Sequence, residues 1–497
     1  MLNAPLNVVT MGIHWIDVTL FLLFAAGTMA FGLSFVKQNK NVSDYTKGGG
    51  SIPGVVVGMS IFATYVSSIS FLGLPGNAFS GSWNAFVFSL SIPVASIVAA
   101  RYFVPFYRSI GSISAYSFLE TRFGYWARAY AAVCYLLTQV ARIGSVLFLL
   151  ALSLHYMLGW SVASIIVITG IAVVLYSVVG GIKAVIWTDA IQGTILILGA
   201  LVCVVLLFVD LPGGINQFIA VGKSADKFTL GPFGSRLDIP TFWVTLCYGI
   251  FINLQNYGID QNYIQRYKSA SDDKGARFSA LFGGLIYLPV SFLFFLIGTA
   301  LFVYYQAQPE RLPPDVAGDQ VFPFFIVNEL PVGFTGLLIA AIFSAAMSTV
   351  STSINSGATI ILTDFVERGK RRLTERKKMT VLYLTSLLFG VMGIAVGLAM
   401  MSVKSALDAW WSMASIFSGG MLGLFLLGYL SKKAGNRAAV TGVALGILLI
   451  FWMSLYGQSM FHSYLTIVFG TILIFGTGFL LGWMGDRFRK STLSDRR

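Results

Sequence analysis

Charged residues are scarce in this sequence. Only 11% of the 497 residues are Asp, Glu, Lys or Arg, against roughly 25% in a typical soluble domain, which argues against a soluble globular fold. Cysteine and histidine are also few, with three of each. The sequence contains no nucleophile–base pattern, metal-ligand cluster or phosphate-binding loop. We therefore expect neither an enzyme nor a disulfide framework.

Hydrophobic residues dominate the composition instead. They make up 56% of the chain, and the mean hydropathy is +0.79. Because a spanning helix takes about 20 residues, apolar runs between charged, Gly or Pro breaks predict an all-α integral membrane protein within a lipid bilayer. We place thirteen spans, at residues 13–35, 53–76, 83–107, 126–157, 161–179, 185–209, 241–263, 279–306, 334–364, 379–402, 408–430, 437–456 and 462–485.

Basic residues indicate how these spans are oriented. The net charge is +13, but Lys and Arg lie in the short breaks between apolar runs, which favours a role in topology over nucleic-acid binding. With the N-terminus outside, 27 of the 33 basic residues fall inside, five outside and one, Arg142, within a span. The first apolar run has no Lys or Arg before it, so we expect it to span rather than to be a cleaved signal.

One long outside connection, residues 307–333, contains an apolar stretch at 321–330 that is too short to span. Two interpretations stay open for it. It forms a short helix over an outer entrance, or it is only a tether.

The second span is unusually rich in hydroxyl groups. Six such side chains occur within eleven residues: Ser60, Thr64, Tyr65, Ser67, Ser68 and Ser70. Hydroxyls compete with the helical hydrogen-bond ladder, and Gly73, Pro75 and Gly76 end the segment. We predict a helix interrupted near residues 63–67, with freed carbonyls facing a cavity. The alternative is small residues that pack a helix crossing.

The ninth span carries a second row of hydroxyls. Ser348, Thr349 and Thr352 follow Ala345 at helical spacing and lie on one face, with Ser353 beside them. Opposite a broken helix, such oxygens suit a hard monovalent cation. Ser/Thr packing is again the alternative.

Two opposite charges lie inside predicted spans. An arginine near the bilayer centre costs about 3 kcal/mol, so Arg142 requires a partner or a wet cavity. Either it pairs with Asp189, which lies a few residues into the sixth span, or it meets a bound anion that accepts two parallel hydrogen bonds. The seventh span adds polar groups that line an exit path or cap a helix end: Asn253, Gln255, Asn256, Asp260, Gln261 and Asn262.

Six segments, taken together and in order, resemble the sodium:solute symporter family. They are residues 43–50, 74–76, 114–124, 180–189, 261–267 and 345–349. The resemblance covers about residues 37–430 and implies a LeuT-like 5+5 inverted repeat, in which the first helix of each repeat is broken. It divides the chain into an extra N-terminal helix, two repeats and two C-terminal helices, at residues 13–35, 53–209, 241–430 and 437–485.

The resemblance also implies where sodium binds. The main site would use the backbone carbonyls of Ala63, Val66 and Ala345 with the hydroxyls of Ser348 and Thr349. A second site would use Asp189, Thr349, Thr352 and Ser353. We therefore expect Na⁺ as the co-transported ion, with two ions per cycle.

For the solute, the sequence is most similar to bacterial sodium/sialic-acid symporters. Arg142 matches the arginine that binds the substrate carboxylate, and Ser67 and Ser70 match hydroxyls that line the pocket. Tyr65, Ala85 and Ser89 stand where Thr, Phe and Gln are expected, so the pocket loses an amide and an aromatic wall and gains a phenol.

These features lead to one expected function. We expect a monomeric symporter of the bacterial inner membrane, with a cytoplasmic C-terminus, that imports an anionic solute such as sialic acid. The alternatives are a sodium symporter for a neutral sugar, polyol, monocarboxylate or amino acid, and, further away, a transporter-like receptor or channel.

Overall fold

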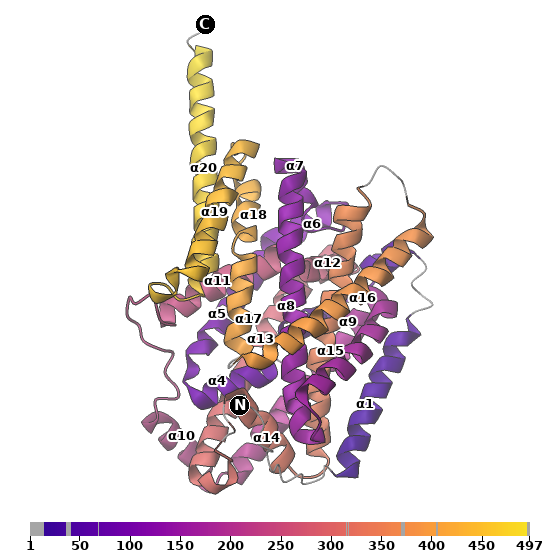
Figure 1. Cartoon of the computed structure of the whole chain (residues 1–497), viewed down its shortest axis with the longest axis vertical. Helices are drawn as coiled ribbons and strands as arrows, with labels where there is room; N and C mark the ends of the chain where they lie inside the picture. Colours follow the sequence, from indigo (N-terminus) through magenta and orange to yellow (C-terminus); the bar gives the residue numbers. More distant parts are fainter. Residues whose placement is uncertain are drawn as a thin grey trace.

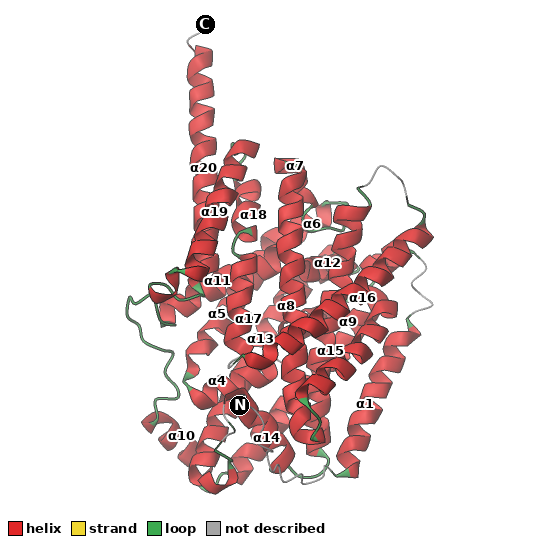
Figure 2. Cartoon of the chain, in the orientation of Figure 1, coloured by secondary structure: helices red, strands yellow, loops and turns green. Residues whose placement is uncertain are grey.

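The structure is a computed structural model that describes residues 14–35, 41–67, 69–314, 316, 318–368, 373–403 and 406–494. Ser68 lies outside the described residues. The described chain consists of helices and connecting loops (Figure 2). Its first half contains α1 Trp15–Ser34, α2 Val42–Lys47, η2 Gly48–Gly50, α3 Gly54–Tyr65, η3 Ile69–Gly73, α4 Leu74–Ser80, η4 Trp83–Ala85, α5 Phe86–Val98, η5 Ala99–Phe103, α6 Val104–Ser109, α7 Ser117–Phe123, α8 Tyr125–Leu158, α9 Val162–Asp210 and α10 Gly214–Ser224.

The second half has the same helical character. It contains α11 Phe242–Ile259, α12 Gln261–Ser269, α13 Asp273–Ala307, η6 Pro309–Arg311, η7 Gly318–Gln320, α14 Val321–Asn328, α15 Phe334–Ile360, η8 Ile361–Val366, α16 Glu375–Ala399, η9 Met400–Ser402, α17 Ala406–Ser418, α18 Met421–Leu430, α19 Asn436–Leu455, η10 Gly457–Ser459 and α20 Leu465–Ser494.

Many of these helices are long and apolar enough to cross a membrane. Among the described residues there are nine such helices, or eleven if each of two bent pairs counts as one span. A shorter apolar helix covers Val162–Leu175, and α9 is interrupted at Gly181, where φ is 63° and ψ is 177°. This interruption falls between the predicted fifth and sixth spans. The multi-span, all-helical prediction is confirmed, and the full number of thirteen stays a prediction.

Helix α15 forms the centre of the molecule. It packs against α8, α9 and α1 (Figure 1), and every residue from Leu338 to Ile360 is buried. Its sequence is rich in Ala, Ser and Thr, and small residues let helix backbones approach closely in a membrane. The predicted row of hydroxyls therefore lies in the interior of the bundle rather than at its surface.

The predicted break in the second span is present. Helix α3 ends at Tyr65, and Val66 takes an extended conformation with ψ of 104°. The two helical parts, Gly54–Tyr65 and Ser70–Ser80, are bent by 59°. A second break follows α11, where Asp260 has ψ of 124° and its side chain accepts a hydrogen bond from the Asn262 backbone N–H. Of the two interpretations of the seventh-span polar groups, helix capping holds for Asp260.

Two shorter features complete the fold around α15. Within the apolar stretch at 321–330, Val321–Asn328 forms the helix α14, and its expected place over an outer entrance stays a prediction. At the edge of the bundle, α1 places the buried carboxylate of Asp17 at the start of α15, where one of its oxygens accepts the N–H groups of Gly333 and Gly336 at 2.8 and 2.7 Å. The N-terminal helix is thus bonded to the central one.

Candidate functional site

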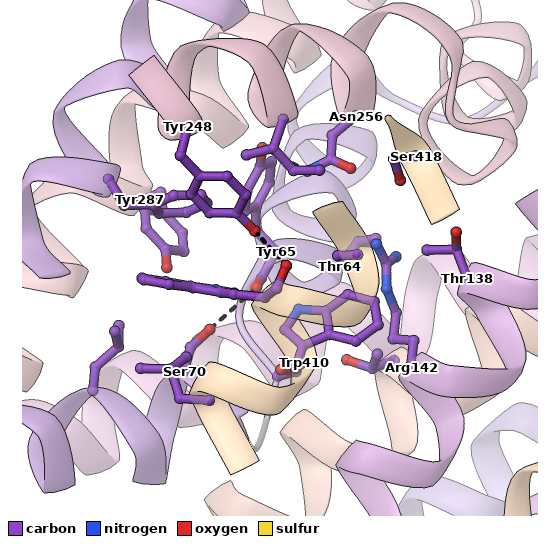
Figure 3. Close-up of a pocket in the computed structure, with 18 of the residues that line it drawn as sticks. Thr64, Tyr65, Ser70, Thr138, Arg142, Tyr248, Asn256, Tyr287, Trp410 and Ser418 are labelled. Carbon is purple, nitrogen blue, oxygen red and sulfur yellow. Dashed lines mark hydrogen bonds between the residues drawn. The ribbon is translucent and has the colours of Figure 1, made fainter. Parts of the chain in front are cut away.

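A cavity lies beside the break between α3 and η3. Arg142 and Thr138 of α8 lie on one side of it, and Tyr248 and Tyr287 lie on the other (Figure 3). Its lining includes one cation and seven aromatic side chains: Tyr65, Phe88, Tyr248, Tyr263, Tyr287, Trp410 and Trp411. The hydroxyls of Thr64, Ser67, Ser70, Thr138, Thr349 and Ser418 and the amide of Asn256 supply the polar groups. Among the described residues no acidic side chain lines it, so the cavity favours an anion with a substantial apolar face.

Arg142 is the charged group of this cavity. Its residue is 9% exposed, and within the described part of the chain no hydrogen bond holds its guanidinium. Its contacts are an Nη2 atom 3.7 Å from Asp260 Oδ2 and the ring of Trp410, whose centroid is 5.2 Å from Cζ. Because a guanidinium carries five N–H donors, Arg142 can still donate two parallel hydrogen bonds to a carboxylate.

Tyr65 fills part of the same cavity. Its hydroxyl donates to the side-chain oxygen of Asn253 and accepts a hydrogen bond from Asn256 Nδ2 at 3.3 Å. Its ring lies 5.6 Å from the ring of Tyr257. The phenol that replaces the expected Thr is therefore engaged with α11 and presents mainly its ring to a ligand.

The six predicted substrate contacts do not all meet at this cavity. Arg142, Tyr65, Ser67 and Ser70 line it. Ser89 lies outside the lining and shares a 2.7 Å hydrogen bond with Ser291. Ala85 lines a separate cavity together with Asp408 and His462. In this conformation the last two positions do not contact the Arg142 cavity.

The residues predicted for the main sodium site lie next to each other across α3 and α15. The Ser348 hydroxyl is 3.5 Å from the Ala63 carbonyl oxygen, and the Thr349 hydroxyl is 3.1 Å from the carbonyl oxygen of Ala345. The extended backbone of Val66 interrupts the regular ladder next to them. All five residues are buried. The arrangement offers the hard oxygen donors that a small monovalent cation prefers.

The residues predicted for a second sodium site form a different environment. Asp189 is fully buried, and Arg266 Nη2 donates both to its Oδ2 and to the Thr352 hydroxyl, at 2.7 Å each. Two buried oxygens here, Asp189 Oδ1 and Ser353 Oγ, have no hydrogen-bond partner among the described residues. Unpaired buried oxygens of this kind fit a cation as an additional partner.

Arg266 is the residue that sequence reasoning misplaced. The predicted seventh span ends at residue 263, which places Arg266 in the inside loop that follows, and Arg142 was the partner considered for Asp189. Instead, Arg266 is fully buried and pairs with Asp189, while Arg142 lies beside Asp260. The error has a physical cause. The chain breaks at Asp260 and continues as the short helix α12, so a polar segment that reads as a loop remains inside the bundle.

The sequence matches the sodium:solute symporter family over residues 45–446, which is most of the chain. The protein belongs to this family. Na⁺ is accordingly its coupling ion, and the predicted identification of the family is confirmed.

Two relatives of this sodium:solute symporter and one solved structure similar to it are all named as sodium-coupled sialic acid symporters. Sodium/sialic acid symporter NanT of Aliivibrio fischeri is 31% identical over 95% of this chain and 93% of its own length. Sodium/sialic acid symporter SiaT of Proteus mirabilis is 33% identical over 91% of this chain and 92% of its own length. A Na⁺-coupled sialic acid symporter, solved in a substrate-bound outward-open state, has a TM-score of 0.89 at 29% identity and covers 95% of this chain and 98% of that one. The predicted LeuT-like architecture is confirmed by this likeness.

Proposed function

We propose that this symporter carries a carboxylate-bearing solute into a bacterial cell across the inner membrane, and that sialic acid is the first candidate. The observation that carries the proposal is Arg142, a buried guanidinium that faces the aromatic cavity with no hydrogen bond from the described residues. An anion with two oxygens in one plane satisfies this group, whereas a neutral solute leaves it poorly compensated. The names of the relatives point to the same solute.

Substitution of Arg142 tests this proposal. Arg142→Ala should abolish sodium-driven uptake of labelled sialic acid by proteoliposomes, and Arg142→Lys should restore little, because a lysine cannot form the bidentate fork. Ser145→Ala is a matched control on the same helix, since the bond that the buried Ser145 hydroxyl makes within the described chain stays inside α8, to the Ala141 carbonyl. Uptake that survives Arg142→Ala at the wild-type rate rejects the role of Arg142.

A more compact monocarboxylate is the second candidate. The Tyr65 hydroxyl is already engaged by Asn253 and Asn256, and Ala85 and Ser89 stand outside the cavity. These features leave fewer polar partners in the cavity for the hydroxyl groups of a sugar acid. A thermal-shift screen of sialic acids, sugar acids and short monocarboxylates, with and without sodium, separates the two, because a ligand of the folded form raises apparent stability.

We also propose that two sodium ions accompany each solute anion, one beside Ala63 and Ser348 and one beside Asp189 and Ser353. Each ion supplies about 2.3 kcal/mol per 100 mV and about 1.4 kcal/mol for a tenfold gradient. Two ions less the charge of the anion leave roughly 5 kcal/mol, enough for more than thousandfold accumulation, whereas one ion leaves about 1.4. Net movement of one positive charge per anion supports two ions, and an electroneutral cycle rejects them.

The predicted orientation and organisation belong to the same proposal. The charge distribution of the loops favours an N-terminus outside and a cytoplasmic C-terminus, with two inverted repeats at 53–209 and 241–430. The two breaks, at Val66 and Asp260, stand in the first helix of each predicted repeat. We propose that the protein works as a monomer. Labelling of cysteines introduced at the two termini from either side of the membrane tests the orientation.

A further inference from the structure

Arg142 and Asp260 form a buried ion pair that lies beside the substrate cavity. The nitrogen-to-oxygen distance is 3.7 Å, and both side chains are almost fully buried. This separation is too long for a hydrogen bond, so the pair is held by charge alone. Among the described residues, the other cation whose charge reaches Asp260 is Arg266, and it already donates to Asp189. The attraction between Arg142 and Asp260 is thus weak enough for another anion to compete with Asp260 for Arg142.

Asp260 has a second role that remains available if Arg142 leaves it. It lies at the break between α11 and α12, and its Oδ1 atom accepts the Asn262 backbone N–H at 2.8 Å as the N-cap of α12. A carboxylate at a helix N-terminus is stabilised both by this hydrogen bond and by the helix dipole. The carboxylate of Asp260 is therefore not left without a partner when the guanidinium turns to another anion.

We propose that Asp260 is the internal counter-ion of Arg142 in the empty carrier, and that the carboxylate of the solute displaces it. The inference rests on the proposed function, in which Arg142 binds the solute carboxylate. Two consequences follow. In the empty carrier the guanidinium is neutralised by Asp260, so the unloaded protein can reorient without a bare buried charge. In the loaded carrier Asp260 no longer pairs with Arg142, so the break between α11 and α12 loses its ionic contact with α8.

The variant Asp260→Asn tests this exchange because an amide keeps the cap but removes the charge. The empty variant carries an uncompensated Arg142, so sialic acid should bind more tightly, with an apparent Kd lower by about fivefold or more, in the usual range of coupling between two sites. Net sodium-driven uptake should fall, since the empty variant reorients poorly. Exchange of labelled for unlabelled sialic acid should persist, since exchange never requires the empty carrier to return.

A measurement that needs no identified solute accompanies this test. Formate supplies a bare carboxylate, so replacing chloride by formate at constant sodium should raise the melting temperature of Asp260→Asn more than that of the wild type. Asp17→Asn is the matched control. It changes another buried carboxylate that accepts backbone N–H groups but lies away from the cavity, so its response to formate should equal that of the wild type.

Each outcome decides the proposal. Loss of exchange together with net uptake in Asp260→Asn, or a formate response no larger than that of the wild type, overturns it and assigns Asp260 a purely structural role. Failure of the proposed function looks different, because Arg142→Ala would then leave solute binding unchanged. In the double variant Arg142→Ala/Asp260→Asn the gain in formate response should disappear, since the cation that binds it is gone.

Discussion

The guanidinium of Arg266 donates to the carboxylate of Asp189 at 2.7 Å, and neither side chain has exposed surface. Arg266 also donates to the hydroxyls of Ser60 and Thr352 and to the Asn262 carbonyl. One side chain thus joins α3, α9, α12 and α15 at the centre of the bundle. Both broken helices meet α15 at this point.

Removal of one partner of this pair should destabilise the fold. We expect Arg266→Met to lower the free energy of unfolding by about 3–5 kcal/mol, because Asp189 is left as an uncompensated buried charge. The double variant Arg266→Met/Asp189→Asn should recover much of the loss. Thermal unfolding in detergent, compared at one sodium concentration, measures both. A single variant as stable as the wild type contradicts the structural role assigned to the pair.

Much of the architecture could be predicted from the sequence, because a lipid environment requires long apolar runs. Polar side chains within such runs face the protein interior or a cavity rather than lipid. The break near Val66, the hydroxyl face of α15 and the position of Arg142 at a cavity follow from such patterns. The partners of the charges did not follow. Whether Arg142 faces Asp189 or Asp260 depends on how the helices pack, and hydropathy carries no information about pairing between distant segments.

The surroundings of Tyr65, Ala85 and Ser89 could not be predicted from the sequence either. The replacement of Thr by Tyr65 was visible, but the hydrogen bonds of its hydroxyl to Asn253 and Asn256 depend on the rotation of α11 against α3. Likewise, the 2.7 Å bond between Ser89 and Ser291 joins α5 to α13. Tyr65 and Ser89 therefore bond to neighbouring helices here.

The hydroxyl of Ser348 should matter for sodium and not for folding. Ser348→Ala removes one oxygen beside the Ala63 carbonyl, and a hydrogen-bond or ligand contact to a charged group is worth about 1.5–3 kcal/mol. We expect the sodium concentration for half-maximal uptake to rise by about tenfold or more. Ser344→Ala, one turn away on α15 with its hydroxyl bonded to the Ala340 carbonyl, should leave that concentration unchanged. Equal sodium dependence in both variants would falsify the site.

Asp17 should stabilise the start of α15 from the N-terminal helix. Its carboxylate accepts the N–H groups of Gly333 and Gly336, so Asp17→Ala removes a cap and should cost about 1–2 kcal/mol of stability. Asp17→Asn retains an acceptor oxygen and should cost less. Limited proteolysis in detergent, followed over temperature, distinguishes the two. If both substitutions cost the same, the charge rather than the cap holds α1 in place.

His462 should make stability depend on pH. It lies in the connection between α19 and α20, where its Nδ1 faces the Tyr464 N–H at 3.4 Å, and burial lowers its pKa below the usual value while the nearby Asp408 opposes the shift. The unfolded chain takes up this proton near pH 6.5, so the stabilising contribution is complete above that pH and is lost as the pH falls below it. We expect the melting temperature of the wild type to fall more steeply than that of His462→Gln between pH 7 and pH 5. Asp408→Asn should make the loss of stability continue to lower pH, because it removes the carboxylate that keeps the pKa of His462 from falling further. If His462→Gln keeps the full pH dependence of the wild type, the titrating group lies elsewhere.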